Sequence, residues 1–400
     1  MLKEIIISVL LRGYDFRSRQ KDHGGSPMKV ICEHKDLMRS LNIISKAVPA
    51  KPTLPILGNV LIHYGDKKIT LTAYDLEMGV RHTFPAKTEG NGDLALPAKL
   101  LHEIISHLPE GELILDVDSS NRMTVRTESS EYDIHGIVSE EYPNFPDIKE
   151  KGSTFETTHD ALLDSLKKTT YASSKDSART WTSGIYMLVE GKKLSLIATD
   201  GRRLAMDRCA IKGRAPKEGI SALIPTKTMD DLLRILLLGY EGEVKITISK
   251  NMTQFELGET VIVSHLLDAQ FPDYQRVIPT DFKGKLVIGK EKLAQAIRGV
   301  SIVAKQREGR DMAILSTDGN MLTISAHVEN VGSSKQKLQV EKEGEELKVA
   351  FNYQFLMDPI ANIDNDEIEL KYGGQLQPGL ITIPEDEDYL YVIMPVRLTE

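Results

Sequence analysis

One pattern recurs three times along this 400-residue chain, and it limits the possible folds more than any other feature. Each copy has a short apolar strand pattern, a polar turn, and a helix pattern with apolar residues three and four positions apart. The copies are "VICEHKDLMRSLNIISKAV" (30–48), "FETTHDALLDSLKKTTYAS" (155–173) and "LVIGKEKLAQAIRGVSIVA" (286–304). From Leu37 to Leu162 is 125 positions and from Leu162 to Leu293 is 131, far longer than a solenoid period. The sequence therefore predicts three domains of one fold.

Two further segments repeat in the same order within each copy. A strand, a turn and a returning strand are expected at 69–84, 194–209 and 322–338. A second amphipathic helix, followed by an acidic turn and a strand, is expected at 96–117, 224–248 and 349–372. Two helices among roughly eight short strands per copy give the α+β class, with helices on antiparallel sheets.

Linkers rich in Pro, Gly and Lys separate the copies at 143–153 and 278–285. We therefore place the domains at 28–150, 153–279 and 284–400. Residues 1–27 are polar and aperiodic after a short apolar run, and a strand-to-helix pattern begins only at Met28. We expect residues 1–27 to be a disordered extension or a misassigned start.

The stretch "LSLIATDGRRLAMDR" (194–208) has an Asp-Gly-Arg-Arg sequence at the end of a strand pattern. It could be an acid/base site, a phosphate-binding loop or a structural turn. Asp200 corresponds to Asp75 in the first copy and to Val328 in the third. A catalytic acid has no reason to recur in an earlier domain, whereas Asp stabilises turns by bonding to its own backbone. We therefore interpret Asp200 as a turn residue.

No stretch has the spacing of a catalytic or metal-binding motif. The ten histidines are scattered, and HExxH, GxxxxGK[ST], GxGxxG after a strand and GxSxG are all absent. The acidic run "PEDEDY" (384–389) lacks the glycine and alternation of a calcium loop, so we expect a solvated loop there. The sequence predicts no enzyme active site, no metal and no cofactor.

Cysteine usage and hydropathy bear on the location of the protein. Cys32 and Cys209 have neither CxxC nor zinc spacing and are expected to be buried thiols in a reducing cytoplasm. No run approaches the roughly 20 apolar residues of a membrane span. The run "IIISVLL" (5–11) is followed by charged residues without a cleavage site, so no signal peptide is expected. We expect a cytoplasmic protein without membrane contact.

Positive charge is concentrated in the first helical segment of each copy. The formal net charge of the chain is −8, which alone argues against nucleic-acid binding. Yet the segments 33–51, 157–179 and 290–310 have net charges of +2, +1 and +4, which leaves −15 for the rest of the chain. A single basic helix face is ordinary, but three corresponding ones in an acidic protein indicate a shared basic surface.

Four motifs in order resemble the bacterial sliding clamp, the β subunit of DNA polymerase III. They are "KPTLPILGNVLI" (51–62), "ATDGRRLA" (198–205), "FPDYQRVIP" (271–279) and "YVIMPVRL" (391–398), and the resemblance covers residues 28–400. It implies the DNA-clamp fold, a head-to-tail homodimer that forms a ring of six domains, and duplex DNA threaded through a helix-lined hole. It also implies a clamp loader, a replicative polymerase and other peptide-motif proteins as partners, and a non-catalytic role in the polymerase complex.

The resemblance assigns roles to individual residues. The basic residues expected to contact DNA backbone are Lys51, Arg39, Lys46, Lys99, Lys175, Arg179, Arg298 and Lys305. The residues expected to form a pocket for partner peptides are Thr199, Gly201, Arg202, Leu204, Pro272, Val277, Val392, Met394 and Pro395. Some of these could instead be core residues. The dimer interface is expected to bring Tyr132 and Ile134 against Ile302 and Val303. "ESSEYDIHG" is acidic and "AKQREGRD" is basic, so the polarity of salt bridges there can be the reverse of that in many relatives.

Two other functions fit parts of the pattern. A three-domain interaction scaffold that never encircles DNA would be a monomer, and its basic helices would be ordinary solvated faces. A nucleic-acid enzyme could use Asp75 and Asp200 as metal ligands, but Val328 and the lack of histidine or carboxylate clusters argue against it.

Overall fold

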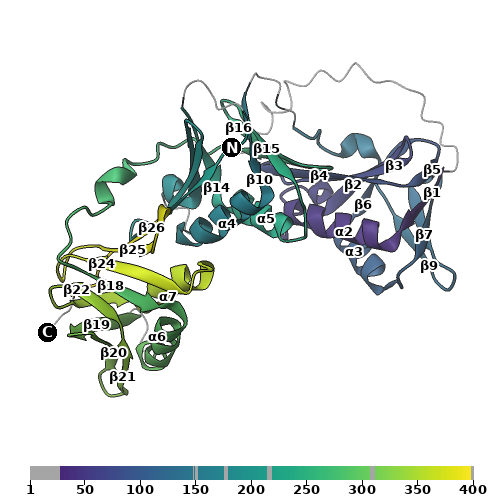
Figure 1. Ribbon diagram of the computed structural model, residues 1–400. Coiled ribbons are helices and arrows are strands. Elements are labelled where there is room, and N and C mark those ends of the chain that lie inside the picture. The colour runs from purple at the N-terminus through teal and green to yellow at the C-terminus, as the bar shows by residue number, and fades with distance from the viewer. Residues whose placement is uncertain are drawn as a thin grey trace, which may run out of the picture.

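The chain forms three successive units along an arc (Figure 1). The computed structural model describes residues 28–146, 148, 152–174, 179–213, 219–306 and 311–397. The α-helices lie on the concave side of the arc, and the sheets form its outer side (Figure 1). The expectation for residues 1–27 lies outside the described residues.

The three units share one order of elements, with one exception. The first unit contains β1 (Met28–Glu33), α2 (His34–Ile44), β2 (Asn59–Gly65), β3 (Lys68–Tyr74), β4 (Met78–Pro85), β5 (Lys87–Glu89), β6 (Gly92–Pro97), α3 (Ala98–His107), β7 (Glu112–Val117), β8 (Arg122–Arg126) and β9 (Glu131–His135). The second contains β10 (Ser153–Thr158), α4 (His159–Thr169), β11 (Gly184–Glu190), β12 (Lys193–Thr199), β13 (Arg203–Ala210), β14 (Ile220–Pro225), α5 (Thr226–Leu236), β15 (Glu243–Ile248), β16 (Met252–Leu257) and β17 (Thr260–His265). The third contains β18 (Gly284–Gly289), α6 (Lys290–Ala304), β19 (Met312–Asp318), β20 (Met321–Val328), β21 (Gly332–Gln339), β22 (Glu341–Gly344), β23 (Lys348–Asn352), α7 (Tyr353–Asn362), β24 (Glu367–Tyr372), β25 (Gly379–Ile383) and β26 (Asp386–Ile393). The exception is that no strand is described between β13 and β14 of the second unit, where the first and third units have β5 and β22.

The expected α+β class with paired helices and antiparallel sheets is confirmed. One expectation differs: the run 384–389 is not a loop, because β26 already begins at Asp386. The side chain of Asp388 in this strand forms an ion pair with Lys193 of β12, which fixes the acidic run against the second unit.

Local sequence explains where the helices begin and which face they bury. Thr158 ends β10 in an extended conformation, and its hydroxyl accepts a hydrogen bond from the amide of Ala161 at the start of α4. Along α4, Leu162 and Leu166 are four positions apart and fully buried. Asn352 caps α7 in the same way, with its side chain accepting from the amide of Gln354. The apolar spacing in the sequence therefore corresponds to the buried face.

One polar contact recurs in all three units and joins the two helices of each unit. The first residue of the first helix bonds through its side chain to a carbonyl at or just after the end of the second helix. The pairs are His34 with Ile105 at 2.8 Å, His159 with Leu236 at 3.1 Å and Lys290 with Ile363 at 2.7 Å. Carbonyls in the last turn of a helix have no amide partner four residues on, and in each unit this contact gives a carbonyl at that end a side-chain donor.

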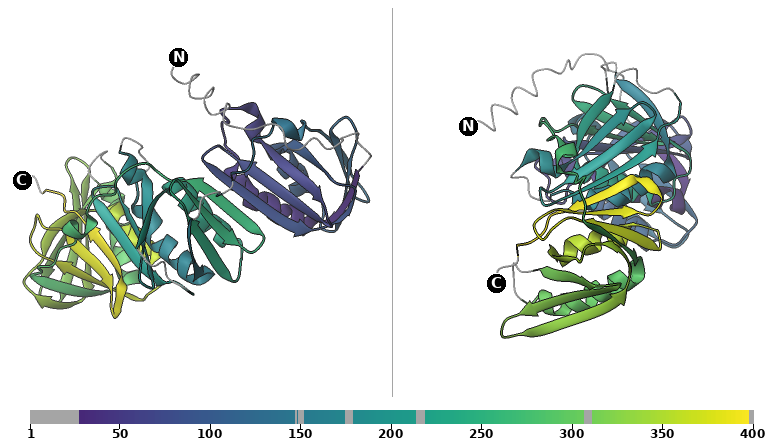
Figure 2. Two further views of the ribbon diagram at one scale, coloured as in Figure 1. Left: turned by 90° about the horizontal axis from the view of Figure 1, so that it is seen from above. Right: turned by 60° about the vertical axis from the view of Figure 1, so that its left-hand side comes forward.

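Strand pairing joins neighbouring units into continuous sheets (Figure 2). The last strand of the second unit, β17, pairs with β4 in an eight-stranded sheet. The last strand of the third unit, β26, pairs with β13 in a nine-stranded sheet. β4 and β13 are both the returning strand of the repeated hairpin. Each junction thus pairs the last strand of one unit with the hairpin strand of the unit before it.

This pairing rule leaves one strand without its counterpart at each end of the arc. β9 ends a five-stranded sheet, and β21 ends a four-stranded sheet. A strand at the other edge of each unit is covered. The residues that follow the last strand of a unit hydrogen-bond to the carbonyls of Ala95 in β6, Leu223 in β14 and Ala350 in β23. No such cover lies on β9 or β21 within the described residues. Exposed edges of this kind are sites for pairing with another chain.

In the part of the chain that is described, no helix is both long and apolar enough to span a membrane.

Candidate functional site at the junction of the second and third units

The turn between β12 and β13 is held by side-chain bonds to its own backbone. Asp200 Oδ1 accepts from the amides of Arg202 at 2.8 Å and Arg203 at 3.1 Å. The Thr199 hydroxyl accepts from the Gly201 amide at 3.0 Å and donates to the Arg203 carbonyl at 2.6 Å. Gly201 has φ +85°, a left-handed conformation that favours glycine. The interpretation of Asp200 as a turn residue is confirmed.

Arg203 connects this turn to the third unit. Its side chain is only 9% exposed, and its Nε lies 3.1 Å from Asp200 Oδ2. It also pairs with Asp358 of α7 and donates to the Tyr171 carbonyl at 2.6 Å. The guanidinium carbon lies 4.4 Å from the centroid of the Phe355 ring, a cation–π distance. The Asp200 carboxylate is therefore neutralised from within the junction.

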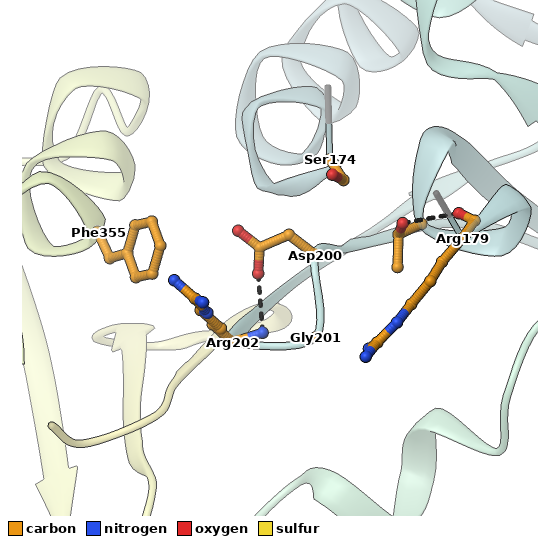
Figure 3. Close-up of a pocket in the computed structure, with 7 residues that line it drawn as sticks. Ser174, Arg179, Asp200, Gly201, Arg202 and Phe355 are labelled. Atoms are coloured by element: carbon orange, nitrogen blue, oxygen red, sulfur yellow. Dashed lines mark hydrogen bonds between the residues drawn. The ribbon is translucent and has the colours of Figure 1, made fainter. Parts of the chain in front are cut away.

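A pocket of about 550 Å³ opens beside the turn (Figure 3). It is lined by Ser174, Arg179, Thr182, Asp200, Gly201, Arg202 and Phe355. The side chains of Arg179 and Arg202 are exposed, and no carboxylate pairs with either of them within the described residues. Since Asp200 already has Arg203 as its partner, the described lining residues have an excess of positive charge.

An apolar surface continues from this pocket. The amide of Met394 donates to the Arg202 carbonyl at 3.0 Å, so the segment after β26 runs directly beside the turn. Met394 is 42% exposed and Val277 is 48% exposed. Pro272 is also exposed and Pro395 is half-buried.

Two residues of the expected pocket are core residues. Leu204 is 3% exposed and Val392 is 1% exposed, and they are opposite each other in the pairing of β13 with β26. They form a small apolar cluster, separate from the main core, against which Tyr274 and Ile278 pack. The alternative that such residues are core residues therefore holds for these two. Thr199, 7% exposed, braces the turn.

The expected DNA-contacting residues are distributed over several elements of the arc. Arg39 on α2 is exposed and donates to the Gly239 carbonyl of the second unit at 2.8 Å. Lys99 on α3 has a 90% exposed side chain, 3.9 Å from Glu103. Lys51, Arg298 and Lys305 are exposed, and Lys46 is half-buried. Arg179 lies in the pocket and not on one of the helices. Lys175 lies outside the described residues.

The expected dimer residues lie at the two open ends of the arc. Tyr132 on β9 is 39% exposed, and Ile302 on α6 is 60% exposed, with Val303 half-buried beside it. Ile134 departs from the expectation because its side chain is 1% exposed and packs in the main core. It is not available to a second chain.

The sequence analysis missed part of both sites. Ser174, Thr182 and Phe355 line the pocket but belong to none of the quoted motifs. The returning strand of the third hairpin was expected, but its role as the open strand β21, with exposed Lys335 and Lys337, was missed. That role depends on the pairing between units, in which β21 occupies the position of β4 and β13.

The two junctions differ in a titratable group at one position, which is buried in the second junction and half-buried in the first. On β13, Asp207 is 3% exposed, contacts the Ser165 hydroxyl and lies 3.5 Å from Lys168 Nζ. Burial raises the pKa of the Asp207 carboxyl to about 6. On β4, the corresponding residue is His82, which bonds to the Thr260 hydroxyl of β17 at 2.8 Å. Burial lowers the pKa of the His82 imidazole to about 4, and nearby Arg39 acts in the same direction.

Comparison with known families decides the identity of the fold. Models of the DNA polymerase III beta subunit match the chain in order: the N-terminal domain at residues 28–146, the central domain at 156–273 and the C-terminal domain at 275–397. The chain belongs to the DNA polymerase III β-subunit family. These three matches cover each of the repeated units, so the repeat seen in the sequence is the three-domain repeat of this family.

Individual members of the β-subunit family are similar over almost the whole chain. The beta sliding clamp of Synechococcus elongatus is 28% identical over 374 residues, covering 93% of this chain and all of that protein. The beta sliding clamp of Bacillus subtilis is 27% identical, covering 92% of this chain and all of that protein.

Solved structures of β subunits agree. The Bacillus subtilis sliding clamp has a TM-score of 0.87 at 27% identity, covering 94% of this chain and all of that one. The sliding clamp of Bartonella birtlesii, solved bound to griselimycin, has a TM-score of 0.86 at 30% identity, covering 93% of this chain and all of that one.

Proposed function

We propose that this protein is a sliding clamp: two copies close head to tail into a ring around duplex DNA, and replication proteins bind to the ring through short peptides. The observation that carries this proposal is the strand-pairing rule, which leaves β9 open at one end of the arc and β21 at the other. β9 is the last strand of its unit, as β17 and β26 are of theirs. β21 is the returning strand of its hairpin, as β4 and β13 are of theirs. Pairing β9 of one copy with β21 of the other, twice, continues the rule around a closed ring.

The internal junctions predict the register of this pairing. Val263 of β17 is opposite Gly79, and Val392 of β26 is opposite Leu204. Gly79 and Leu204 occupy the same place in their hairpins, opposite Tyr74 and Thr199. Val263 and Val392 lie four residues before Leu267 and Val396, which make the equivalent bonds to the edge strands, and Asp133 lies four residues before Ile137. In the third hairpin, Ser333 is opposite His327, the residue before Val328. The same register therefore places Asp133 of one copy opposite Ser333 of the other.

The charges on the open strands favour that register. Moving two residues along the antiparallel pair places Glu131 opposite Lys335 of the second copy. β9 carries two acidic side chains, Glu131 and Asp133, while β21 carries two lysines and no acidic residue. Opposite charges facing each other stabilise cross-strand pairs, and like charges disfavour pairing of β9 or β21 with itself. The expected reversal of polarity at the dimer seam remains part of this proposal.

The concave helices give the ring its DNA-facing surface. Exposed basic residues lie on α2, α3 and α6, on the concave side of the arc (Figure 1). Such a surface attracts phosphates without reading bases, so the ring is free to slide. A closed ring is retained by topology, and its residence time depends on the seam more than on the strength of DNA contacts.

The junction pocket is the proposed docking site for a clamp loader, the replicative polymerase and other proteins with peptide motifs. The Bartonella birtlesii relative is bound to griselimycin, which supports a ligand site in this fold. We propose no catalytic role: Asp75 and Asp200 are bonded to backbone amides and paired with Lys227 and Arg203. The chain would act in the cytoplasm, where Cys32 and Cys209 remain free thiols.

Retention on circular DNA tests the proposal. We expect a particle of twice the 44.6 kDa chain mass that stays on nicked circular duplex and dissociates rapidly once the circle is cut. Lys335→Glu should weaken the dimer, and Glu131→Lys combined with Lys335→Glu should restore it. A monomer, or release that is no faster after the cut, would overturn the clamp and favour the non-encircling scaffold.

A further inference from the structure

Resting on the proposed function, we infer that Arg39 has two alternative partners: the Gly239 carbonyl, which ties the first unit to the second, and a DNA phosphate that displaces this carbonyl. Duplex DNA inside the ring then loosens the first junction on its concave side. The inter-unit bond of the free protein and the DNA contact are competing states of one side chain.

The bond that Arg39 makes between the units is within reach of DNA. Its Nη2 donates to the Gly239 carbonyl at 2.8 Å, although the two residues are 200 positions apart in the chain. Gly239 lies three residues after the end of α5, and both Arg39 and Gly239 are exposed. α2 and α5 lie on the concave side of the arc (Figure 1). The bond therefore lies on the surface that we propose to face DNA.

A phosphate is a stronger acceptor for this guanidinium than the carbonyl. The side chain of Arg39 has a single hydrogen bond, to a neutral group, and no ion pair among the described residues. A guanidinium has five N–H donors, and two of them bind a phosphate in a fork geometry with the added attraction of opposite charges.

The place of Gly239 at the end of α5 makes the two partners exclusive. The C-terminal end of a helix carries a partial negative charge, which attracts the guanidinium of Arg39 and repels a phosphate. A phosphate therefore does not share the guanidinium with the Gly239 carbonyl, and the side chain has to leave the carbonyl to bind DNA.

The other bonds of the first junction do not involve Arg39. β17 pairs with β4 from Thr260 to Ser264, and the imidazole of His82 bonds to the Thr260 hydroxyl at 2.8 Å. Lys227 pairs with Asp75. Loss of the Arg39 bond therefore releases the residues that follow α5 and leaves the two units joined.

Within the described residues, the second junction has no exposed counterpart of this bond. Arg39 lies two positions after Leu37, and Asp164 lies two positions after Leu162 of the second copy. Asp164 pairs with Lys168 of its own helix at 2.6 Å. Lys168 lies 3.9 Å from Asp386 of the third unit, but its side chain is only 10% exposed. The effect of DNA is therefore confined to the first junction.

Hydrogen exchange at the end of α5 tests this inference. The full-length protein is measured by mass spectrometry, free and in complexes with nicked circular duplex isolated by gel filtration. We expect the amides of Leu237, Leu238 and Gly239 to exchange about threefold faster in the complex, because one bond that holds this segment is lost. Shielding by DNA slows exchange, so faster exchange distinguishes loss of the bond from simple coverage.

Two substitutions assign the effect to Arg39. Arg39→Met should make these amides exchange faster already in the free protein, and DNA should add no further increase. Lys35→Met is the matched control, because it removes an exposed charge from the same helix and no inter-unit bond among the described residues. It should keep the wild-type response to DNA.

The outcomes separate this inference from the proposed function. Unchanged or slower exchange at these amides in wild-type protein that is retained on circles would overturn the inference and leave the clamp intact. So would an increase on DNA that persists in Arg39→Met. If no protein is recovered with the circles, the clamp fails and the inference falls with it.

Discussion

The two junctions between units have the same backbone plan and different chemistry. Both use an aspartate to hold a four-residue turn: Asp75 accepts from the amide of Met78 at 2.7 Å, just as Asp200 accepts from that of Arg203. In the first junction the second turn residue is Leu76, at φ +76° and 41% exposed, and Lys227 pairs with Asp75.

In the second junction the same position is Gly201, and the fourth position is Arg203 instead of the buried Met78. Arg203 crosses to the third unit, so Asp200 needs no lysine, and the missing side chain at position 201 leaves space beside the turn. Side chains at two turn positions, and not the repeated backbone, therefore set the chemical difference between the two junctions.

Exchange of the fourth turn residue should have the largest effect. Arg203→Met gives the second junction the residue of the first and leaves Asp200 and Asp358 without their shared cation. Removal of one partner from a largely buried ion pair costs about 3–5 kcal/mol, so urea denaturation should show a loss of roughly 3 kcal/mol or more, and peptide binding should fall with it. Arg202→Met is the matched control, because this neighbouring arginine is exposed, and its stability should change by less than about 0.5 kcal/mol. Equal effects of the two changes would show that Arg203 does not hold the junction.

Stability should respond to pH in opposite directions at the two junctions. Asp207 has a raised pKa of about 6, so the folded state keeps this proton at a pH where the unfolded chain has lost it. The stabilisation of the folded state by protonated Asp207 is therefore lost as the pH rises from about 4 to 6. Its charged neighbours are Lys168, Asp164 and Asp386. Asp207→Asn should remove this dependence, which amounts to about 3 kcal/mol at most.

The pKa of His82 is lowered to about 4. The stabilisation of the folded state by neutral His82 is therefore complete above about pH 6.5 and is lost as the pH falls towards 4. Its neighbours are Arg39, Asp36 and Thr260. His82→Gln should remove a dependence of stability on pH that has the opposite sign to that of Asp207 and a similar size. Hydrogen exchange of β13 and β17 between pH 4.5 and 7 would separate the two junctions. Parallel trends in both strands would contradict this assignment.

Exchange of the second turn residue should have the smallest effect on stability. Leu76→Gly relieves a left-handed conformation that costs a non-glycine residue about 1 kcal/mol, and the leucine loses little burial, so thermal denaturation should show equal or slightly higher stability. Gly201→Leu should cost about 1 kcal/mol and place a side chain next to Arg179, which should weaken peptide binding several-fold. Unchanged peptide binding in Gly201→Leu would show that ligands do not approach this wall.

Much of the fold could be predicted from the sequence because it is repeated. Three independent copies of the same helix spacing and hairpin pattern reinforce one another, and an aspartate that recurs as Asp75 and Asp200 favoured a turn over catalysis. The pairing between units could not be predicted, because it joins strands far apart in the chain, such as β13 and β26.

The candidate site was less predictable than the fold. Tyr132 and Ile134 are two apart on one strand and were both expected at the interface, yet only Tyr132 is exposed. Alternation shows which side chains share a face, but it does not show how far the core extends beneath that face. The roles of Arg203 and Phe355 depend on the contact between α7 and the turn, which no local pattern contains.

The central claim, a ring closed by β9 and β21 around DNA, can be tested by covalent closure. In a Cys209→Ser background, with Cys32 buried, Glu131→Cys and Lys335→Cys place one thiol on each open strand. The protein is mixed with nicked circular duplex and then treated with a short bismaleimide. We expect a covalent dimer, crosslinked at both seams, that stays linked to the circle in hot detergent and is released when the circle is cut. A dimer crosslinked at both seams that detergent strips from intact circles, or the absence of any crosslink between these two positions, would contradict the ring model.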